Sequence, residues 1–156
     1  MRKLPNFKFT PAGFQNLREE LETLTLRRPG VLTRLVAARE QGDLSENAGY
    51  HAAKEELGKI DSRMRELKLM MRLGDVVQAK EINTVGFGNI VIVNNGLENL
   101  EFTIVSAQEA NPAVGKVSDN SPIGAALLGK KVGDNVSVYS PSGKADYKIV
   151  EIKTVD

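Results

Sequence analysis

Hydrophobic residues recur at alternating spacings of three and four along the first part of the chain. This spacing is typical of a heptad-patterned helix that packs on a second helix. Thr10-Pro11 precedes the run and predicts the helix start, with Thr10 as N-cap and proline at the first helical position. Because Pro29-Gly30 interrupts the run without shifting its frame, we expect one bent helix. The expected interior positions are Phe14, Leu17, Leu21, Leu24, Val31, Leu35 and Ala38, and only Arg28 breaks the apolar pattern.

A second run with the same spacing follows Gln41-Gly42, and we expect its helix to begin at Asp43. Two long helices joined by a few residues fold back as an antiparallel hairpin, with arms of roughly 40 Å each. Such a pair buries only its inner faces, so we expect its outer surface to be exposed and charged. A coiled coil that dimerises is the alternative that the pattern leaves open. The interior positions expected here are Tyr50, Ala53, Leu57, Ile60, Met64, Leu67 and Met71.

The hydrophobic period changes to two after Gly74, which indicates strands. We therefore expect an α+β protein, with an N-terminal antiparallel two-helix coiled coil at 1–76 and a C-terminal domain at 77–156. The C-terminal domain should hold an antiparallel sheet around one short helix. The expected strands are 89–93, 100–105, 135–139 and 145–152, with an Asn-Gly turn at 94–96 and the helix within 121–129.

Composition excludes several kinds of chemistry. The 156 residues include no cysteine and one histidine, so thiol catalysis, disulfides and histidine-rich metal sites are excluded, and a catalytic triad would need His51 as its base. We expect a cytoplasmic protein, since no apolar run is long enough to span a membrane and no signal peptide is evident. The net charge of +1 conceals 14 basic and 11 acidic residues in 1–76, against 7 and 9 in 77–156.

Three carboxylates, Glu40, Asp43 and Glu46, lie at the expected tip of the hairpin. Asp43 as N-cap with Glu46 three residues later would form a capping box, which is a purely structural role. The same two carboxylates could instead bind Mg²⁺, but two are too few to hold it tightly without a partner's ligands. Arg39 and Lys54 flank the tip and could meet nucleic-acid phosphates, or simply form ion pairs on a solvated face.

The residues around the tip resemble a known family. Residues 38–55 are similar to the tip motif of the Gre family of bacterial transcript-cleavage factors, and Arg27-Arg28-Pro29 resembles its first-helix motif. Asn120-Ser121-Pro122-Ile123, followed by Leu127-Leu128-Gly129-Lys130, resembles its C-terminal signature. These motifs occur in order and span nearly the whole chain.

The resemblance implies a coiled-coil finger and an FKBP-like domain that docks on the rim of the RNA polymerase secondary channel. The finger would enter the channel, where Asp43 and Glu46 would help to hold a Mg²⁺ shared with the polymerase. Backtracked RNA would then be cleaved near its 3′ end. By position, Arg39 and Lys54 would face the RNA, and Asn120, Ser121 and Pro122 would contact the polymerase. The resemblance thus implies an accessory factor without its own active site, with no cofactor bound alone, no membrane partner and a monomeric state.

Four other functions stay open at this point. A Gre-related paralogue could occupy the channel as a regulator or inhibitor without stimulating cleavage. A coiled-coil chaperone is a second possibility, as a pure interaction module. An autonomous nuclease or phosphatase would need a complete set of metal ligands, for which no further acidic cluster is evident. Prolyl isomerisation would follow only from the fold, which does not determine function. Ser121-Pro122 could likewise serve only as a helix start.

Overall fold

A computed structural model describes residues 5–79 and 83–155 of the chain. These residues form two compact units. One unit is Phe14–Gly74, and the other combines the described residues up to Gly13 with those from Asp75 onward. None of the helices in the described ranges combines the length and hydropathy that a membrane span requires. Each unit is described by itself below.

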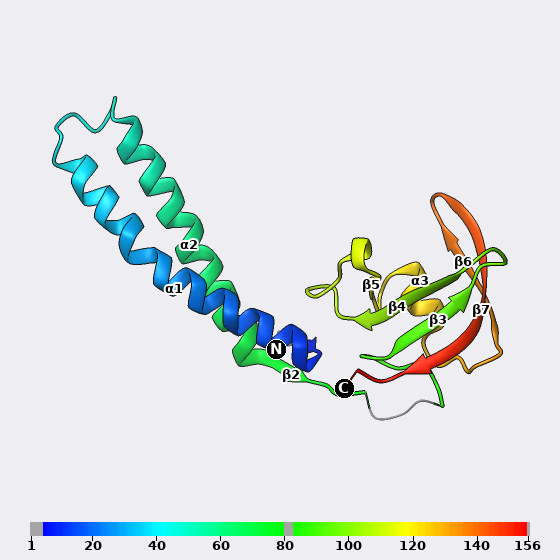
Figure 1. Cartoon of the computed structure of the whole chain (residues 1–156). Coiled ribbons are helices and arrows are strands. Elements are labelled where there is room, and N and C mark those ends of the chain that lie inside the picture. The colour runs from blue at the N-terminus through cyan, green and yellow to red at the C-terminus, as the bar shows by residue number, and fades with distance from the viewer. Residues whose placement is uncertain (1–4, 80–82, 156) are drawn as a thin grey trace. The chain divides into compact units, whose positions relative to one another are not determined.

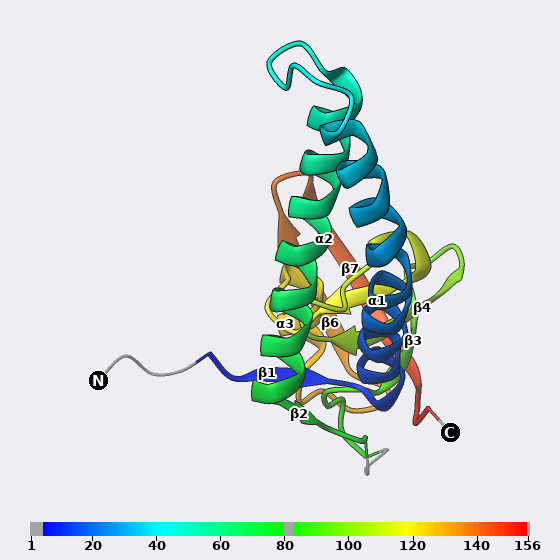
Figure 2. The ribbon, with the colours of Figure 1, turned by 90° about the vertical axis from the view of Figure 1, so that its left-hand side faces the viewer.

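Two long helices, α1 (Pro11–Arg39) and α2 (Ala48–Leu73), run side by side in opposite directions (Figures 1 and 2). The hairpin predicted from the heptad spacing is therefore confirmed. α1 begins as expected, because the Thr10 hydroxyl oxygen accepts a hydrogen bond from the amide of Gly13 at 3.1 Å. Pro29 lies inside α1 without ending it, so this segment is one helix.

The interior of the hairpin follows the predicted stripe. Every predicted apolar position in both runs is buried or half-buried, and most residues between these positions are exposed. Arg28 occupies its stripe position half-buried, because its guanidinium reaches across to Asp61 on α2 with N–O distances of 2.6 and 3.2 Å. The most buried stripe residues are Leu17, Val31, Ala53, Ile60 and Leu67.

Ion pairs tie the two helices together along one side of this stripe, since Glu20, Arg27 and Arg34 recur every seven residues on α1. Glu56 on α2 accepts hydrogen bonds from both Arg27 and Arg34 of α1. Nearer the base, Arg63 of α2 bonds to Glu20 of α1 at 2.6 Å. The first-helix motif Arg27-Arg28-Pro29 thus supplies two of the arginines that join the arms. The outer surface is exposed and carries many charges, as expected, but Leu26, Leu32 and Val36 of α1 are exposed there as well.

The second unit is built on a five-stranded sheet in the order β5-β4-β3-β7-β6, which curls around a short helix, α3 (Pro122–Leu127) (Figure 1). Neighbouring strands among β4, β3, β7 and β6 are antiparallel, as expected. The bounds are β3 Ile90–Asn94, β4 Asn99–Val105, β5 Lys116–Ser118, β6 Asn135–Ser140 and β7 Gly143–Lys153.

The core of this unit lies between the sheet and α3. Val91, Val93 and Ile104 from the sheet and Leu127 from α3 are completely buried. The turn between β3 and β4 is the predicted Asn-Gly turn, with Gly96 at a φ of +94°. That conformation suits glycine because it has no Cβ. These alternating strands were therefore placed correctly, to within a residue or two at their ends.

Three short strands were not predicted. β5 joins the edge of β4 in parallel, after a single 3₁₀ turn at Pro112–Val114, so the sheet is not wholly antiparallel. β1 (Phe7–Phe9) and β2 (Gly74–Val76) form a separate two-stranded sheet. The amide of Val77 extends this pairing by donating to the carbonyl of Phe9 at 2.8 Å. Strands of three residues carry too little alternation to be recognised from the sequence.

Candidate functional site

The tip of the hairpin is a loop formed by residues 40–47 (Figure 2). α2 begins at Ala48, so the expectation that it starts at Asp43 is wrong. Gly42 has a φ of +113°, a conformation that turns the chain away from α1 and that favours glycine. Asp43 and Glu46 therefore lie in the loop rather than on one face of a helix.

Asn47 caps α2. Its side-chain oxygen accepts a hydrogen bond from the amide of Tyr50 at 2.9 Å, and its side-chain nitrogen donates to the carbonyl of Ala38 at 2.6 Å. One residue thus satisfies a free donor at the start of α2 and adds a second donor to the Ala38 carbonyl, which also accepts from the amide of Gln41 at 3.2 Å. The capping box of Asp43 and Glu46 is consequently wrong, and neither carboxylate is needed to begin the helix.

Asp43 and Glu46 are both exposed. One oxygen of Asp43 accepts hydrogen bonds from the amide and the hydroxyl of Ser45, at 3.0 and 2.8 Å. These bonds, the backbone one first, lower the pKa of Asp43 below its ordinary value, because they stabilise the charged carboxylate. Within the described ranges, the side chain of Glu46 makes no hydrogen bond or ion pair. The loop therefore presents an ionised Asp43 and an unengaged Glu46 to solvent.

This donor set suits part of a metal site rather than a whole one. Carboxylate oxygens are the protein ligands that Mg²⁺ prefers, and Mg²⁺ usually keeps waters or phosphates in its shell. Among the residues that the structure describes, no three acidic or histidine side chains gather as a metal site would require. Asp43 and Glu46 could therefore contribute to a shell whose remaining ligands come from another molecule.

The basic residues predicted beside the tip lie on its two flanking helices. Arg39 is the last residue of α1 and is exposed, in line with the preference for positive charge at a helix C-terminus. Lys54 is exposed on α2, with its ammonium 5.8 Å from the centre of the Tyr50 ring. His51 is exposed and packs edge-on against Tyr50 at 5.4 Å between ring centres. This surface position agrees with a histidine outside any catalytic arrangement.

The predicted docking residues precede α3 in the other unit. Ser121 is the N-cap of α3, since its hydroxyl oxygen accepts from the amide of Gly124 at 3.1 Å and donates to the carbonyl of Ser118 at 2.6 Å. The structural role expected for Ser121-Pro122 is therefore confirmed. Asn120 and Pro122 on either side are exposed. The loop holds a fixed backbone that displays these two side chains.

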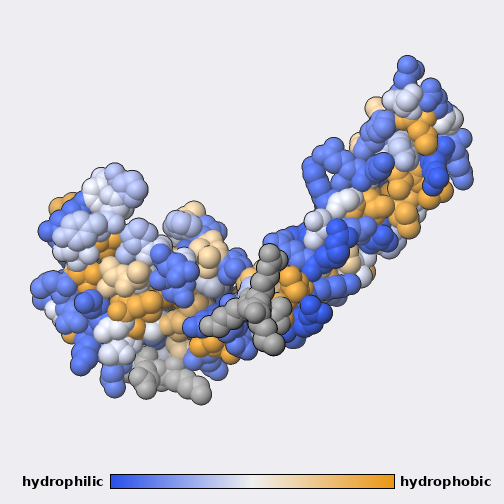
Figure 3. Space-filling view, turned by 180° about the vertical axis from the view of Figure 1, so that it is seen from behind, coloured by the Kyte–Doolittle hydropathy of each residue, from blue (hydrophilic) through white to orange (hydrophobic). Residues whose placement is uncertain are grey.

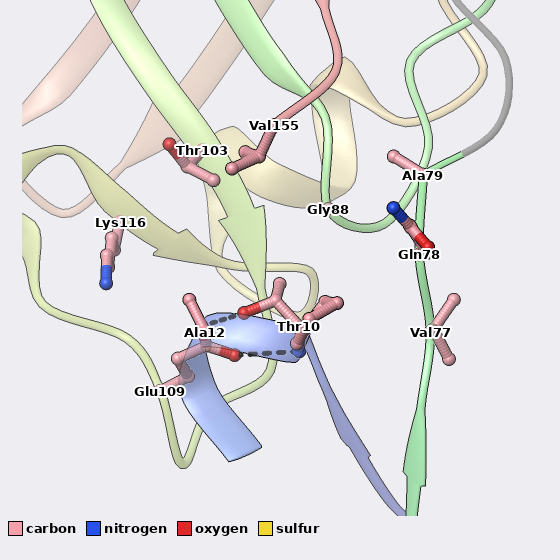
Figure 4. Close-up of a pocket in the computed structure, with 11 residues that line it drawn as sticks. Thr10, Ala12, Val77, Gln78, Ala79, Gly88, Thr103, Glu109, Lys116 and Val155 are labelled. Carbon is pink, nitrogen blue, oxygen red and sulfur yellow. Dashed lines mark hydrogen bonds between the residues drawn. The ribbon is translucent and has the colours of Figure 1, made fainter. Parts of the chain in front are cut away.

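A small cavity in this unit was not anticipated from the sequence (Figure 4). Its volume is about 240 Å³, and its walls are mostly apolar, including Val77, Ala79 and Val155. Glu109 lies at its edge and accepts hydrogen bonds from the amide of Thr10, at 3.2 Å, and from its hydroxyl. None of the predicted site residues lines the cavity.

Both halves of the chain match family models of transcription elongation factors. Residues 7–76 match "Transcription elongation factor, N-terminal", and residues 78–154 match "Transcription elongation factor, GreA/GreB, C-term". The helical hairpin thus matches the N-terminal model, and the curled sheet matches the C-terminal model, of one class of transcription elongation factor. The chain belongs to the GreA/GreB family of transcription elongation factors.

Relatives named transcription elongation factor GreA resemble the whole chain. The one from Nitratiruptor sp. is 38% identical over 147 residues, covering 92% of this chain and 90% of the relative. The one from Alkaliphilus oremlandii is 42% identical over 148 residues, covering 92% and 93%. A crystal structure of GreA factor homolog 1 from Thermus thermophilus is 32% identical, covers 95% of this chain and 99% of that one, and has a TM-score of 0.46. Within the family the sequence resembles GreA most, and the names of the two relatives agree with this.

Proposed function

We propose that this chain binds RNA polymerase, inserts its helical hairpin into the secondary channel and stimulates cleavage of backtracked RNA by the polymerase. In this role it is an accessory factor of the cytoplasm that completes the active centre of the polymerase. One observation carries the proposal. Asn47 caps α2, so the Asp43 and Glu46 carboxylates are not needed as caps and lie exposed at the end of the helical hairpin.

The arrangement of the tip supports a role in trans. A Mg²⁺ shared with the polymerase would activate the attacking water and stabilise developing negative charge. Asp43 and Glu46 would each offer a carboxylate oxygen to that shared shell. The two bonds from Ser45 hold one oxygen of Asp43 and leave the other free of described hydrogen bonds. The lowered pKa of Asp43 keeps the group ionised and ready to bind a cation.

The exposed basic residues support contact with the RNA end. Arg39 is the last residue of α1 and Lys54 lies in the second turn of α2, so both flank the loop that carries the carboxylates. Cationic side chains attract phosphates and position a nucleic acid without reading its sequence. In the proposed complex they hold the backtracked RNA beside the tip. Asn120, Ser121 and Pro122 supply a docking loop in the other unit.

The experiment uses purified polymerase stalled on a template with its RNA backtracked, and it follows the RNA 3′ end after addition of the full chain and Mg²⁺. The wild-type chain should stimulate cleavage. Asp43→Asn and Glu46→Gln should each lower the stimulated rate on the order of tenfold or more, which corresponds to about 1.4 kcal/mol or more of activation free energy. Asp43→Asn is well suited because an amide oxygen can still accept from Ser45.

Glu40→Gln is the matched control, because Glu40 is an exposed carboxylate at the same loop and the substitution removes the same charge. It should leave the cleavage rate close to that of the wild type. All three variants should displace labelled wild-type chain from polymerase equally well. Equal cleavage by Asp43→Asn, Glu46→Gln and wild type would contradict the proposed metal role.

Two further outcomes separate the alternative functions. Binding of the wild-type chain to polymerase without stimulated cleavage would favour a regulator or inhibitor that occupies the channel. Cleavage of RNA by the chain in the absence of polymerase would favour an autonomous nuclease. Substitution of Asn120 or Pro122 by alanine should weaken polymerase binding, while cleavage at saturating concentration stays near the wild-type value.

A further inference from the structure

The tip half of α1 carries an uncharged, largely apolar outer surface. At 100° per residue, six residues lie together on the side of α1 that faces away from the interior stripe or beside that side. Figure 3 shows hydrophobic side chains gathered on the hairpin between its middle and its tip. We call this surface the outer α1 patch, and it consists of Leu26, Pro29, Leu32, Thr33, Val36 and Ala37.

Packing within the hairpin does not account for this patch. Leu26, Leu32 and Val36 are 75%, 39% and 48% exposed, while Val31 between them is buried against α2. Leu32 and Val36 line a shallow groove that continues to Glu40. The solvent side of a surface helix is normally polar or charged, and a contiguous exposed apolar area marks an interaction surface.

The charges around the patch define what can cover it. Arg27 and Arg34 lie along one long side and share a single carboxylate, that of Glu56, so this side keeps a net positive charge. Arg39 lies on the other long side near the tip. The two ends of the patch are acidic, with Glu22 toward the base and Glu40 at the loop.

These charges disfavour a second copy of the chain as the occupant. In either a parallel or an antiparallel symmetric pairing, the arginine sides of the two copies would meet, and glutamates would meet at both ends. Like charges placed together across an interface are unfavourable. Six residues also fall well short of the roughly 20 to 30 residues per partner in a stable interface. The patch therefore fits a supplementary contact within a larger assembly, on a surface with an apolar centre and carboxylates along its sides.

The position of the patch links it to the tip. Val36 lies three residues, or about 5 Å along the helix axis, before the end of α1. Whatever encloses Asp43 and Glu46 must therefore also pass alongside Val36 and Ala37. We propose that the outer α1 patch docks on an apolar, acid-rimmed surface of the RNA polymerase channel wall and holds the tip in place. This inference rests on the proposed function, from which it takes the identity of the partner.

The test compares the wild-type chain with the double variant Leu32→Ser/Val36→Ser on backtracked polymerase complexes. Loss of two apolar side chains from a covered patch should raise the concentration for half-maximal cleavage about tenfold or more. The cleavage rate at saturation should stay near the wild-type value, because Asp43 and Glu46 are unchanged. The urea unfolding midpoint should fall only slightly, because Leu32 and Val36 are 39% and 48% exposed and serine is a weaker helix former than leucine.

Leu69→Ser is the matched control, because Leu69 on α2 is as exposed as Leu32, at 39%, and lies outside the patch. It should leave the concentration for half-maximal cleavage unchanged.

The sign of a charge introduced at Val36 gives an independent test. Val36→Lys should weaken the interaction less than Val36→Glu, since the proposed partner surface has an acidic rim.

Four outcomes would overturn the inference. The first is that the double variant and the wild type have the same concentration for half-maximal cleavage, while the wild type does stimulate cleavage. That result would leave the proposed function intact. The second is an equal loss with Leu69→Ser, which would show that the patch has no special role. The third is a wild-type dimer in sedimentation that Leu32→Ser/Val36→Ser converts to a monomer. The fourth, absence of any polymerase binding by wild type, would overturn the proposed function as well.

Discussion

The side-chain nitrogen of Asn47 donates a hydrogen bond of 2.6 Å to the carbonyl of Ala38, which joins the start of α2 to the end of α1. The oxygen of the same amide caps α2 through the amide of Tyr50. Both ends of the tip loop are thus held by one residue. The loop that carries Asp43 and Glu46 depends on this amide for its shape.

Asn47→Ala should destabilise the chain by about 1–2 kcal/mol, because it removes the N-cap and the shorter of the two hydrogen bonds that the Ala38 carbonyl accepts. Urea unfolding followed by circular dichroism measures this change. Asn47→Asp is the informative comparison, since it keeps the acceptor for Tyr50 and loses only the donor to Ala38. A loss with Asp equal to the loss with Ala would mean that the bridge to Ala38, rather than the cap, provides the stability.

Acid should loosen the hairpin. The Arg28 guanidinium lowers the pKa of Asp61, and Arg34 and Arg27 lower the pKa of Glu56, in both cases chiefly through hydrogen bonds. Because the folded-state pKa values lie below the unfolded values of about 4, these carboxylates stabilise the fold fully above that range. Their contribution is lost as the pH falls through the folded-state values.

The measurement is the urea midpoint of the hairpin helices at pH 7 and at about pH 3. The midpoint should fall with pH in the wild type. The double variant Asp61→Asn/Glu56→Gln should have a lower midpoint at pH 7 and a smaller fall on acidification. A pH dependence unchanged in this variant would show that other carboxylates with a lowered pKa, such as Glu55 beside Lys59, carry the effect.

Pro29→Ala should stabilise α1. Proline has no amide hydrogen, so position 29 cannot donate the helical hydrogen bond to the carbonyl of Thr25, one turn earlier. Alanine would restore this donor. The helix gain of about 3 kcal/mol is partly offset by about 0.4–1 kcal/mol from a more flexible unfolded chain, which leaves about 2 kcal/mol. Chemical unfolding tests this estimate. A lower midpoint would mean that packing against α2 requires the bend that proline favours.

Gly124→Ala should destabilise the sheet unit. A Cβ at this position would lie 1.9 Å from the carbonyl oxygen of Ser118, which is backbone and cannot move aside alone. Forcing the two segments apart should cost about 2–3 kcal/mol or more and should displace the adjoining loop at Ser121. Gly58→Ala in α2 is the control, because nothing lies within 4 Å of its added Cβ and helix propensity should then raise stability slightly.

The helices and the longer strands could be predicted because the spacing of their apolar residues is visible along the sequence. Each apolar position of the two heptad runs lies on the buried side of its helix, and even the exception, Arg28, indicated a polar contact inside the stripe. The strands from Ile90 onward follow their alternation. These features depend on local periodicity, which the sequence displays directly.

The tip could be predicted in its residues but not in its geometry. Asp43 has a capping box spacing, and local rules favour it as the N-cap, whereas Asn47 takes that place because its amide also reaches Ala38 nine residues earlier. That advantage appears only once both helices are formed. The outer α1 patch was missed for a related reason: α1 is apolar on two sides there, and the stripe conceals the second. The functional roles of Asp43, Glu46, Arg39, Lys54 and the docking loop stay predictions until cleavage and binding are measured.

The bidentate pair between Arg28 and Asp61 determines how far the tip can reach. Two heptad-patterned helices can in principle slide past each other by seven residues and still match apolar positions, a shift of about 10 Å along the axis. A slide by seven residues would place Arg28 beside Lys54 or Lys68, each seven residues from Asp61, and would place Asp61 beside Leu21 or Leu35 instead of its partner. The pair therefore specifies the register of α1 against α2. A fixed register keeps the two carboxylates of the tip at one distance from the base of the hairpin.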